Sequence, residues 1–329
     1  MSATLGQSGS QSQALAEIWH EWLWREQREF RVMGRGSSGV AERGADLPMS
    51  MACLDLSDEI DCGTDTVRLT TADGVATVRL NRPQSLNAMN KDLLQGFSTC
   101  LDILARRTDI RVVILTGTGR AFCAGGDMKD RLSVIGATAV DDAVRLRRAA
   151  STTERLFALP QVTLAAINGP CAGAGVAWAA ACDLRFADRR AIFNPAYLEI
   201  GLAGDLGGAW MLSRVIGASR GIDWFLRPRR ISSSEAQSAG FVTVLAEPEE
   251  FVDSVLTCAQ HLSRSGRDVL SAIKANFRES EFASFHKYLN RETVRHVRVR
   301  HGVIQTESVV REMADRVAEV GDVSQSAEI

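Results

Sequence analysis

Along the chain, short apolar segments typical of strands alternate with longer segments whose apolar residues have helical spacing. This pattern predicts a mixed α/β fold. Short apolar runs at Arg111–Thr116, Val162–Ile167 and Leu184–Ala187 are typical of buried strands. Residues 90–107 carry apolar residues at helical spacing, and residues 141–158 are typical of a more polar helix. Strand–turn–helix units repeated in this way indicate an α/β core with buried sheets.

The start of the core is marked by a hairpin pattern. Thr66–Thr71 and Val75–Leu80 alternate as strands do, around the turn pair Asp73-Gly74. A helix of small residues is expected from about Gly173 to Ala181. We therefore place the α/β core at residues 64–266.

The end of the chain is different in character. After about Arg267 the pattern is purely helical, with Val269, Ile273 and Phe277 on one stripe. A second stripe comprises Val310, Met313, Ala314 and Val317. We expect residues 267–329 to form a separate helical subdomain.

The first 63 residues have no counterpart of the α/β pattern, and we expect an N-terminal extension there. Residues 1–13 are rich in Ser, Gln and Gly, which is typical of disorder, and Ala14–Met33 could form a helix with three tryptophans. That helix has two interpretations: a docking segment, or sequence upstream of a natural start at Met49 or Met51. We favour the second interpretation.

Composition narrows the classes of function. The chain has 329 residues, 45% hydrophobic and 24% charged, with a formal net charge of −2. This near-neutral balance gives no reason to expect nucleic acid as a partner, and no apolar run is long enough to span a bilayer. The start lacks the features of a secretory signal, and the seven cysteines are dispersed without a C-x-x-C pair. We expect reduced thiols, no metal site and a cytoplasmic location.

Two glycine-rich turns carry the candidate chemistry. Residues 120–129 follow the Arg111–Thr116 strand, and residues 167–175 follow the Val162–Ile167 strand and open a helix. Glycines there allow close backbone approach, and the helix start supplies free N–H groups with a partial positive charge. Two such donors converging on one oxygen form an oxyanion hole.

Two other structures could produce glycine-rich turns of this kind. A dinucleotide loop fails because Trp178 occupies the third glycine position of G-x-G-x-x-G, and no P-loop motif occurs in the chain. Either segment alone could be an ordinary tight turn between a strand and a helix. Their pairing favours the oxyanion hole.

The segments AFCAGGDMKD (121–130) and INGPCAGAGVAWAAACDLRFA (167–187) resemble the two signature regions of the crotonase superfamily, the enoyl-CoA hydratase/isomerase family. Three further segments, at 81–90, 200–217 and 232–245, are similar to other regions of that family. The resemblance extends from about Val67 to Gly240. It implies a crotonase-like spiral of ββα units, an acyl-CoA thioester substrate that carries its own coenzyme A, and self-association as trimers or hexamers through the C-terminal helices.

The resemblance also implies site residues. The oxyanion donors would be the backbone N–H groups of Gly126 and Ala174. Residues expected to contact coenzyme A are Leu86, Ala88, Arg120, Ala124, Gly126, Asp127, Met128 and Lys129. For the two basic side chains, Arg120 and Lys129, solvated surface charge is an equally good interpretation.

The chain departs from the hydratase pattern at the catalytic acids. Family members that hydrate enoyl-CoA use two glutamates, whose positions match Ala177 and Tyr197 here. Two carboxylates are needed to activate water and to deliver a proton to the α-carbon. We therefore expect weak or no hydratase activity.

One acid remains at a family active-site position. Asp205 could move a proton as a catalytic acid/base, or it could simply cap the following helix. We favour catalysis; Glu199 is a weaker candidate. Tyr197 could donate a proton or only pack, and two aromatic residues could line the acyl pocket or only fill the core, namely Trp178 and Trp210.

Three functions remain open from the sequence. The first is an acyl-CoA isomerase or lyase with Asp205 as acid/base. The second is a non-catalytic acyl-CoA-binding paralogue. The third is a thioester hydrolase or aryl-CoA enzyme that uses Asp205 as a nucleophile.

Overall fold

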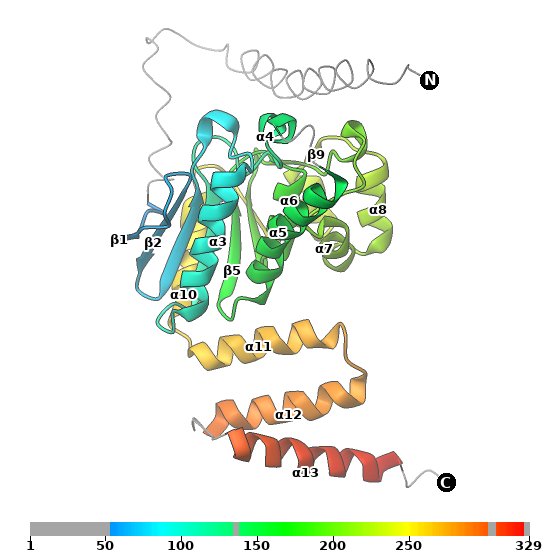
Figure 1. Cartoon of the computed structure of the whole chain (residues 1–329). Coiled ribbons are helices and arrows are strands. Elements are labelled where there is room, and N and C mark those ends of the chain that lie inside the picture. Colours follow the sequence, from blue (N-terminus) through cyan, green and yellow to red (C-terminus); the bar gives the residue numbers. More distant parts are fainter. Residues whose placement is uncertain (1–52, 134–137, 302–306, 326–329) are drawn as a thin grey trace, which may run out of the picture.

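A computed structural model describes residues 53–133, 138–301 and 307–325 (Figure 1). Its main sheet has seven strands in the order β1-β2-β3-β4-β5-β7-β10. They are β1 (Asp58–Ile60), β2 (Val67–Ala72), β3 (Val75–Leu80), β4 (Val112–Gly117), β5 (Val162–Ile167), β7 (Leu184–Asp188) and β10 (Val244–Ala246). A smaller sheet joins β6 (Cys171–Ala172), β8 (Ile192–Asn194) and β9 (Ile231–Ser232). The predicted helix at Ala14–Met33 and the candidate starts lie outside the described residues.

The predicted hairpin forms the antiparallel part of the main sheet. β2 and β3 pair from Val67 with Leu80 to Ala72 with Val75. The turn between them is tight, because Asp73 and Gly74 both have positive φ angles, of 49° and 79°. Asp and Gly tolerate that conformation better than other residues do, which is why this pair predicts a hairpin.

From β3 onward the strands of the main sheet are parallel, and β4 is buried on both faces. β3, β4, β5, β7 and β10 pair in parallel along the sheet. Alternate residues of β4 enter different clusters: Val113 and Leu115 one cluster, Val112 and Ile114 the other. This two-sided burial explains why the sequence shows continuous apolar runs instead of strict alternation.

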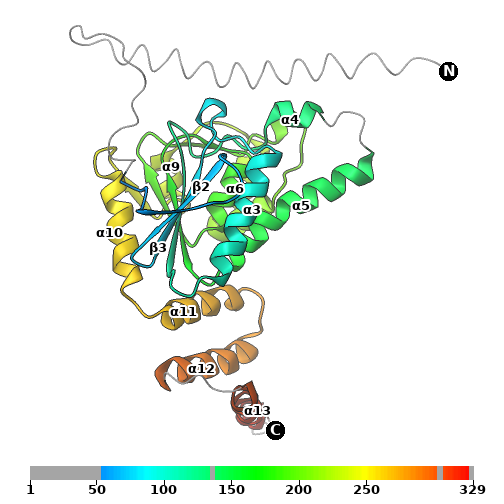
Figure 2. The same cartoon turned by 60° about the vertical axis from the view of Figure 1, so that its left-hand side comes forward.

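Helices cover the two faces of the sheet. Figure 2 shows α3 (Lys91–Arg106) on one side of it and α10 (Phe251–Ser263) on the other. α3 begins where the side chain of Asn90 accepts a hydrogen bond from the Leu93 N–H, at 3.0 Å. The other helices of the α/β part are η1 (Pro83–Ser85), α4 (Met128–Ser133), α5 (Ala139–Ala158), α6 (Ala174–Ala181), η2 (Leu198–Ile200), α7 (Gly208–Val215), α8 (Ala218–Leu226) and α9 (Ser233–Ser238). No helix in the described ranges is long and apolar enough to cross a membrane.

The core begins upstream of the boundary predicted at residue 64. β1 pairs with β2 in antiparallel register, from Asp58 opposite Thr71 to Ile60 opposite Leu69. Leu54 is fully buried in the cluster that contains α10. The sequence did not reveal this segment because the short strand carries two acidic residues and its pairing is non-local.

The C-terminal helices lie beyond one end of the sheet (Figure 1). They are α11 (Arg267–Ser280), α12 (Phe285–His301) and α13 (Glu307–Gln325). On α11 the buried residues are Leu270 and Lys274, whereas Ile273 and Phe277 of the predicted stripe are 51% and 75% exposed. The apolar stripe therefore faces away from the core.

A buried ionic contact fastens α11 to the sheet. Lys274 Nζ donates to the Gln161 carbonyl oxygen at 2.5 Å and lies 2.6 Å from Asp183 Oδ2. Asp183 Oδ2 also accepts hydrogen bonds from the Thr163 N–H and hydroxyl. Burial lowers the pKa of Lys274 to about 8, in spite of the carboxylate beside it.

This pKa predicts a pH-dependent stability. Between about pH 8 and the usual lysine value of 10.5, the unfolded chain binds a proton that the folded chain has released. The free energy of unfolding of the wild type should therefore rise relative to Lys274→Met as the pH increases from 8 to 10. Urea denaturation of both proteins measures this difference. Lys287→Met, at an exposed position of α12, is the control: its free energy of unfolding should differ from that of the wild type by the same amount at each pH. A wild-type minus Lys274→Met difference that does not change with pH would contradict the prediction.

Candidate active site

The two glycine-rich turns lie side by side at the carboxyl ends of β4 and β5. These strands are parallel neighbours, so the segments that leave them emerge at the same edge of the sheet. The Ala172 N–H donates to the Cys123 carbonyl at 2.9 Å, and the Phe122 N–H donates to the Pro170 carbonyl at 3.1 Å. The turns are thus joined by their own backbone.

Glycine is required where the turns meet. A Cβ built on Gly125 would lie 2.9 Å from the Ala172 carbonyl oxygen and 3.3 Å from the Ala174 nitrogen. A Cβ built on Gly175 would lie 2.5 Å from the Cys123 carbonyl oxygen. Gly125 also has a φ angle of 92°, which other residues rarely adopt.

The predicted oxyanion donors sit on these adjoining turns. Ala174 is the first residue of α6, and the N–H groups of a helix start have no partner within the helix. Gly126 is exposed, and no atom lies within 4 Å of a Cβ built on it. Within the described part of the chain, neither N–H donates to a backbone carbonyl. Both groups are therefore available to a ligand.

Three residues expected to contact coenzyme A form one cluster beside the first turn. Leu86, Ala88 and Ala124 pack together with Ala121. The segment before α3 runs parallel to the turn, since the Met89 N–H donates to the Gly125 carbonyl and the Asp127 N–H donates to the Met89 carbonyl. The structure brings these predicted residues together.

The side chain of Asp127 binds two neighbouring groups of the protein. Its Oδ2 lies 2.8 Å from Arg82 Nη1, and its Oδ1 accepts a hydrogen bond from the Lys129 N–H at the start of α4. Arg82 also donates to the Ala88 carbonyl at 2.5 Å. The sequence analysis missed Arg82, because nothing local in the sequence links it to a residue 45 positions away.

Two asparagines form the framework of the turns and were also missed. Asn87 is fully buried with a φ angle of 57°, and its Nδ2 donates to the Thr118 and Ala121 carbonyls. Asn168 Nδ2 donates to the carbonyls of Gly117 and Gly119. Asparagine tolerates positive φ and caps loop carbonyls, which is the signal that could have identified both residues.

Tyr197 and Asp205 form a hydrogen-bonded pair of side chains. The Tyr197 hydroxyl donates to Asp205 Oδ1 at 2.7 Å. Tyr197 is only 3% exposed, and its burial and the adjacent Asp205 charge raise its pKa well above the usual value. The phenol therefore remains protonated and serves as a donor to the carboxylate.

Asp205 does not occupy the N-cap position of α7. The N-cap of α7 is Gly207, with no side-chain cap bond. The chain from residue 201 to 207 instead makes a loop, with positive φ angles at three glycines and at Leu206. This loop presents the Asp205 side chain to Tyr197.

The pair lies next to the helix that carries the second oxyanion donor. Ala177 is one helical turn beyond Ala174 on α6. A Cβ built on Gly208 would lie 3.6 Å from Ala177 Cβ and 3.8 Å from the Tyr197 hydroxyl. The Ala177 side chain and the Tyr197 hydroxyl are thus close together, and neither residue has a carboxyl group.

The other predicted residues lie apart from this pair. Arg120, Lys129 and Glu199 are exposed, and Met128 is half-buried at the start of α4. Trp178 is a core residue: it is fully buried, packs on Phe97 at 4.4 Å and donates to Thr152. Trp210 is partly exposed and stacks on Phe282, so it joins α7 to the C-terminal helices.

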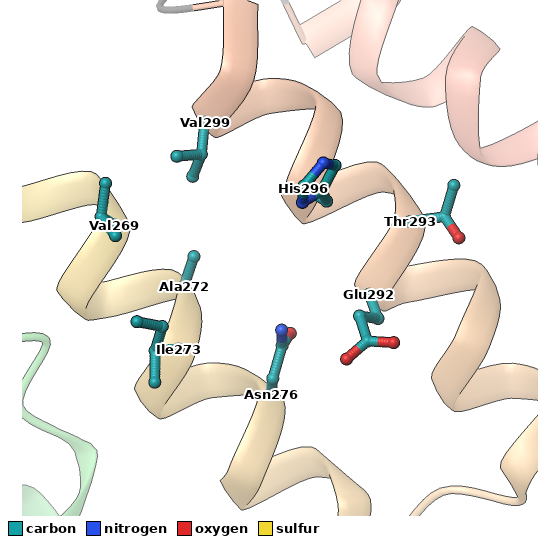
Figure 3. A pocket seen from close by; sticks show the side chains of 8 residues that line it. All are labelled: Val269, Ala272, Ile273, Asn276, Glu292, Thr293, His296 and Val299. Carbon is teal, nitrogen blue, oxygen red and sulfur yellow. The ribbon is translucent and has the colours of Figure 1, made fainter.

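A cavity of about 370 Å³ occurs elsewhere, between α11 and α12 (Figure 3). Valine and isoleucine side chains line one part of it, and Asn276, Glu292 and His296 line the other. α11 docks at Gln161, directly before β5, whereas the glycine turns follow the opposite ends of the strands.

Among the described residues there is no group of three or more His, Cys, Asp or Glu that could hold a metal ion.

Comparisons with known proteins identify the family of the chain. The family model described as enoyl-CoA hydratase/isomerase matches residues 70–312. The 1,2-epoxyphenylacetyl-CoA isomerase of Escherichia coli K12 is 34% identical over 220 residues, which cover 67% of this chain and 84% of that protein. The 4-chlorobenzoyl coenzyme A dehalogenase-2 of an Arthrobacter species is 32% identical, covering 63% of this chain and 75% of its own. An enoyl-CoA hydratase structure from Bacillus anthracis aligns with a TM-score of 0.67 and 28% identity, covering 74% of this chain and 92% of that one.

Proposed function

The chain belongs to the enoyl-CoA hydratase/isomerase family, and we propose that within it the protein is an acyl-CoA isomerase or related lyase. Family membership and the crotonase-type α/β fold confirm what the sequence led us to expect. The proposed reaction needs no cofactor beyond the coenzyme A of the substrate. Its steps follow from the backbone donors and from the Tyr197–Asp205 pair.

The backbone donors supply the binding step of the proposal. The N–H groups of Gly126 and Ala174 would bind the thioester oxygen and stabilise the negative charge that it gains as an enolate. Each donor of this kind is worth roughly 3–4 kcal/mol in the transition state. Support comes from the backbone hydrogen bonds that join the two turns; among the described residues, neither N–H group donates to a backbone carbonyl.

Asp205 would supply the proton transfer. Its carboxylate takes the α-proton as the enolate forms and returns it to another carbon of the same acyl chain, so that a double bond changes position. The Tyr197 hydroxyl keeps Oδ1 of this carboxylate in place. One carboxyl group is sufficient for a proton that leaves and returns.

The observation that carries the proposal is the 2.7 Å hydrogen bond between Tyr197 and Asp205 beside Ala177. A tyrosine and an alanine stand where hydration would need two carboxylates, and the tyrosine proton is directed to Asp205. Hydration of a double bond requires one group to activate water and another to protonate carbon. We therefore propose weak or no hydratase activity.

Two relatives suggest the acyl groups to test first. The names 1,2-epoxyphenylacetyl-CoA isomerase and 4-chlorobenzoyl coenzyme A dehalogenase both specify an acyl group that contains a benzene-derived ring, epoxidised in the first and chlorinated in the second. We propose an aromatic acyl-CoA thioester as the first substrate class to assay. The dehalogenase also keeps open an aryl-CoA reaction with Asp205 as nucleophile, which isotopic oxygen incorporated into Asp205 would reveal.

Self-association is the remaining part of the proposal. Phe277, Phe282 and Phe285, around the link between α11 and α12, are each more than 60% exposed. Large apolar side chains gathered on one surface favour burial against another protein surface. We propose that further copies of the chain cover this face.

The oxyanion role of Ala174 can be tested with a substitution that removes its N–H group without breaking a helical hydrogen bond. Proline is tolerated at the first position of a helix and lacks an N–H. Ala174→Pro should lower kcat by about 10²–10³, as expected for the loss of one donor. Ala218→Pro, at the first position of α8 and likewise after a glycine, is the control and should keep full activity. Equal activity of the two folded variants would refute the oxyanion role of Ala174.

The second prediction concerns Asp205. In deuterated water the wild type should exchange the α-protons of an arylacetyl-CoA or a fatty acyl-CoA, detected by mass spectrometry. Asp205→Asn should slow this exchange by about 10²–10⁴ while thioester binding, measured by calorimetry, remains. Binding without exchange by the wild type would favour the non-catalytic paralogue.

The third prediction concerns the assembly. Sedimentation of the wild type should give a mass of several chains, and Phe277→Glu should shift it toward the monomer, because a charge cannot be buried there without a partner. Val320→Glu, at an exposed position of α13, is the control. A monomeric wild type would contradict self-association.

A further inference from the structure

Phe225 on α8 makes contacts that set it apart from its neighbours. Its ring stacks on Tyr197, with centroids 5.3 Å apart and planes inclined by 20°. The adjacent Leu226 and the nearby Ile222 on the same helix are 60% and 59% exposed. Phe225 is half-buried and directed to the site.

The same ring also touches the loop that carries Asp205. A Cβ built on Gly204 would lie 2.9 Å from Phe225 Cε1, closer than side-chain atoms normally approach. A Cβ built on Gly208 would lie 3.5 Å from Phe225 Cζ. The ring thus packs against Tyr197 and against both ends of the 204–208 segment.

The helix that carries Phe225 is itself fixed. The next residue toward the N-terminus, Trp224, is 3% exposed and packs on Phe241, with centroids 5.7 Å apart. A Cβ built on Gly221 would lie 3.4 Å from the Ser213 nitrogen, so α8 lies close against α7. The Phe225 ring therefore projects from a rigid support.

We infer that Phe225 is a positioning residue that holds the Tyr197–Asp205 pair in its hydrogen-bonded arrangement. The inference rests on the proposed function, in which Asp205 moves the proton. The loop of Asp205 has three glycines and no helix or strand of its own, so contacts from outside the loop restrict it to one conformation. Stacking fixes the ring plane of Tyr197, and contact with Gly204 and Gly208 fixes the loop. A displacement of about 1 Å at such a pair can lower a rate by about 100-fold.

The test needs a signal that reports the Tyr197–Asp205 hydrogen bond, and the size and direction of its change must match those caused by loss of the Asp205 charge. The chain has only two tyrosines, so a protein labelled with [ζ-¹³C]tyrosine gives two resonances. Tyr197→Phe assigns them, and Tyr288, which donates to Glu292 on α12, is an internal reference. Asp205→Asn shows how far the Tyr197 resonance moves when its charged acceptor is lost.

Phe225→Leu and Phe225→Met should each move the Tyr197 resonance by at least about half of that displacement, in the same direction. Both variants should also lower kcat for α-proton exchange about tenfold or more, with KM changed less than about twofold, because the acyl-CoA binding residues are untouched. Leu226→Ala is the control on the same helix and should leave resonance and rate unchanged.

The possible failures are distinguishable. A Tyr197 resonance that stays at its wild-type position in either folded variant overturns the positioning role of Phe225. A resonance that moves while kcat is unchanged overturns it too, since the arrangement would then not matter for proton transfer. Absence of exchange in the wild type overturns the proposed function itself. Circular dichroism establishes that each variant is folded.

Discussion

The candidate site depends on how closely two backbone turns approach each other. A Cβ atom on Gly175 would lie 2.5 Å from the Cys123 carbonyl oxygen, and one on Gly125 would lie 2.9 Å from the Ala172 carbonyl oxygen. Both distances are too short for a side chain. Without those glycines the turns would separate, and the N–H groups of Gly126 and Ala174 would no longer share one region. The parallel pairing of β4 with β5 brings the turns together, and the glycines allow them to touch.

The parts of the fold that are encoded locally were predictable from the sequence. β5 has the predicted bounds Val162–Ile167, and β4 is displaced by one residue from the predicted Arg111–Thr116. Continuous apolar runs between turn residues leave little alternative for a buried strand. The glycine turns could also be predicted, because nearly every other residue has a side chain that prevents two backbone segments from approaching so closely.

Non-local contacts could not be predicted in the same way. The pairing of Arg82 with Asp127, the direction of the Tyr197 hydroxyl and the contact of Phe225 with the Asp205 loop all join distant segments. The helical tail shows the same limit: periodicity identified a stripe on α11 but could not say which side meets the core. A buried lysine beside Asp183 faces inward instead, because its ammonium group finds a carboxylate and a carbonyl there.

Placing the proposed donors in the main chain has a consequence for how such a protein can diversify. Apart from replacement by proline, no substitution removes a peptide N–H group. Substitutions could therefore change the acidic residues around the proposed anion-stabilising centre and leave the centre itself intact. The neighbouring residues Ala177 and Tyr197, for example, carry no carboxyl group. New chemistry can then arise from one or two exchanges in the side-chain layer, without rebuilding the centre that makes the reactive intermediate accessible.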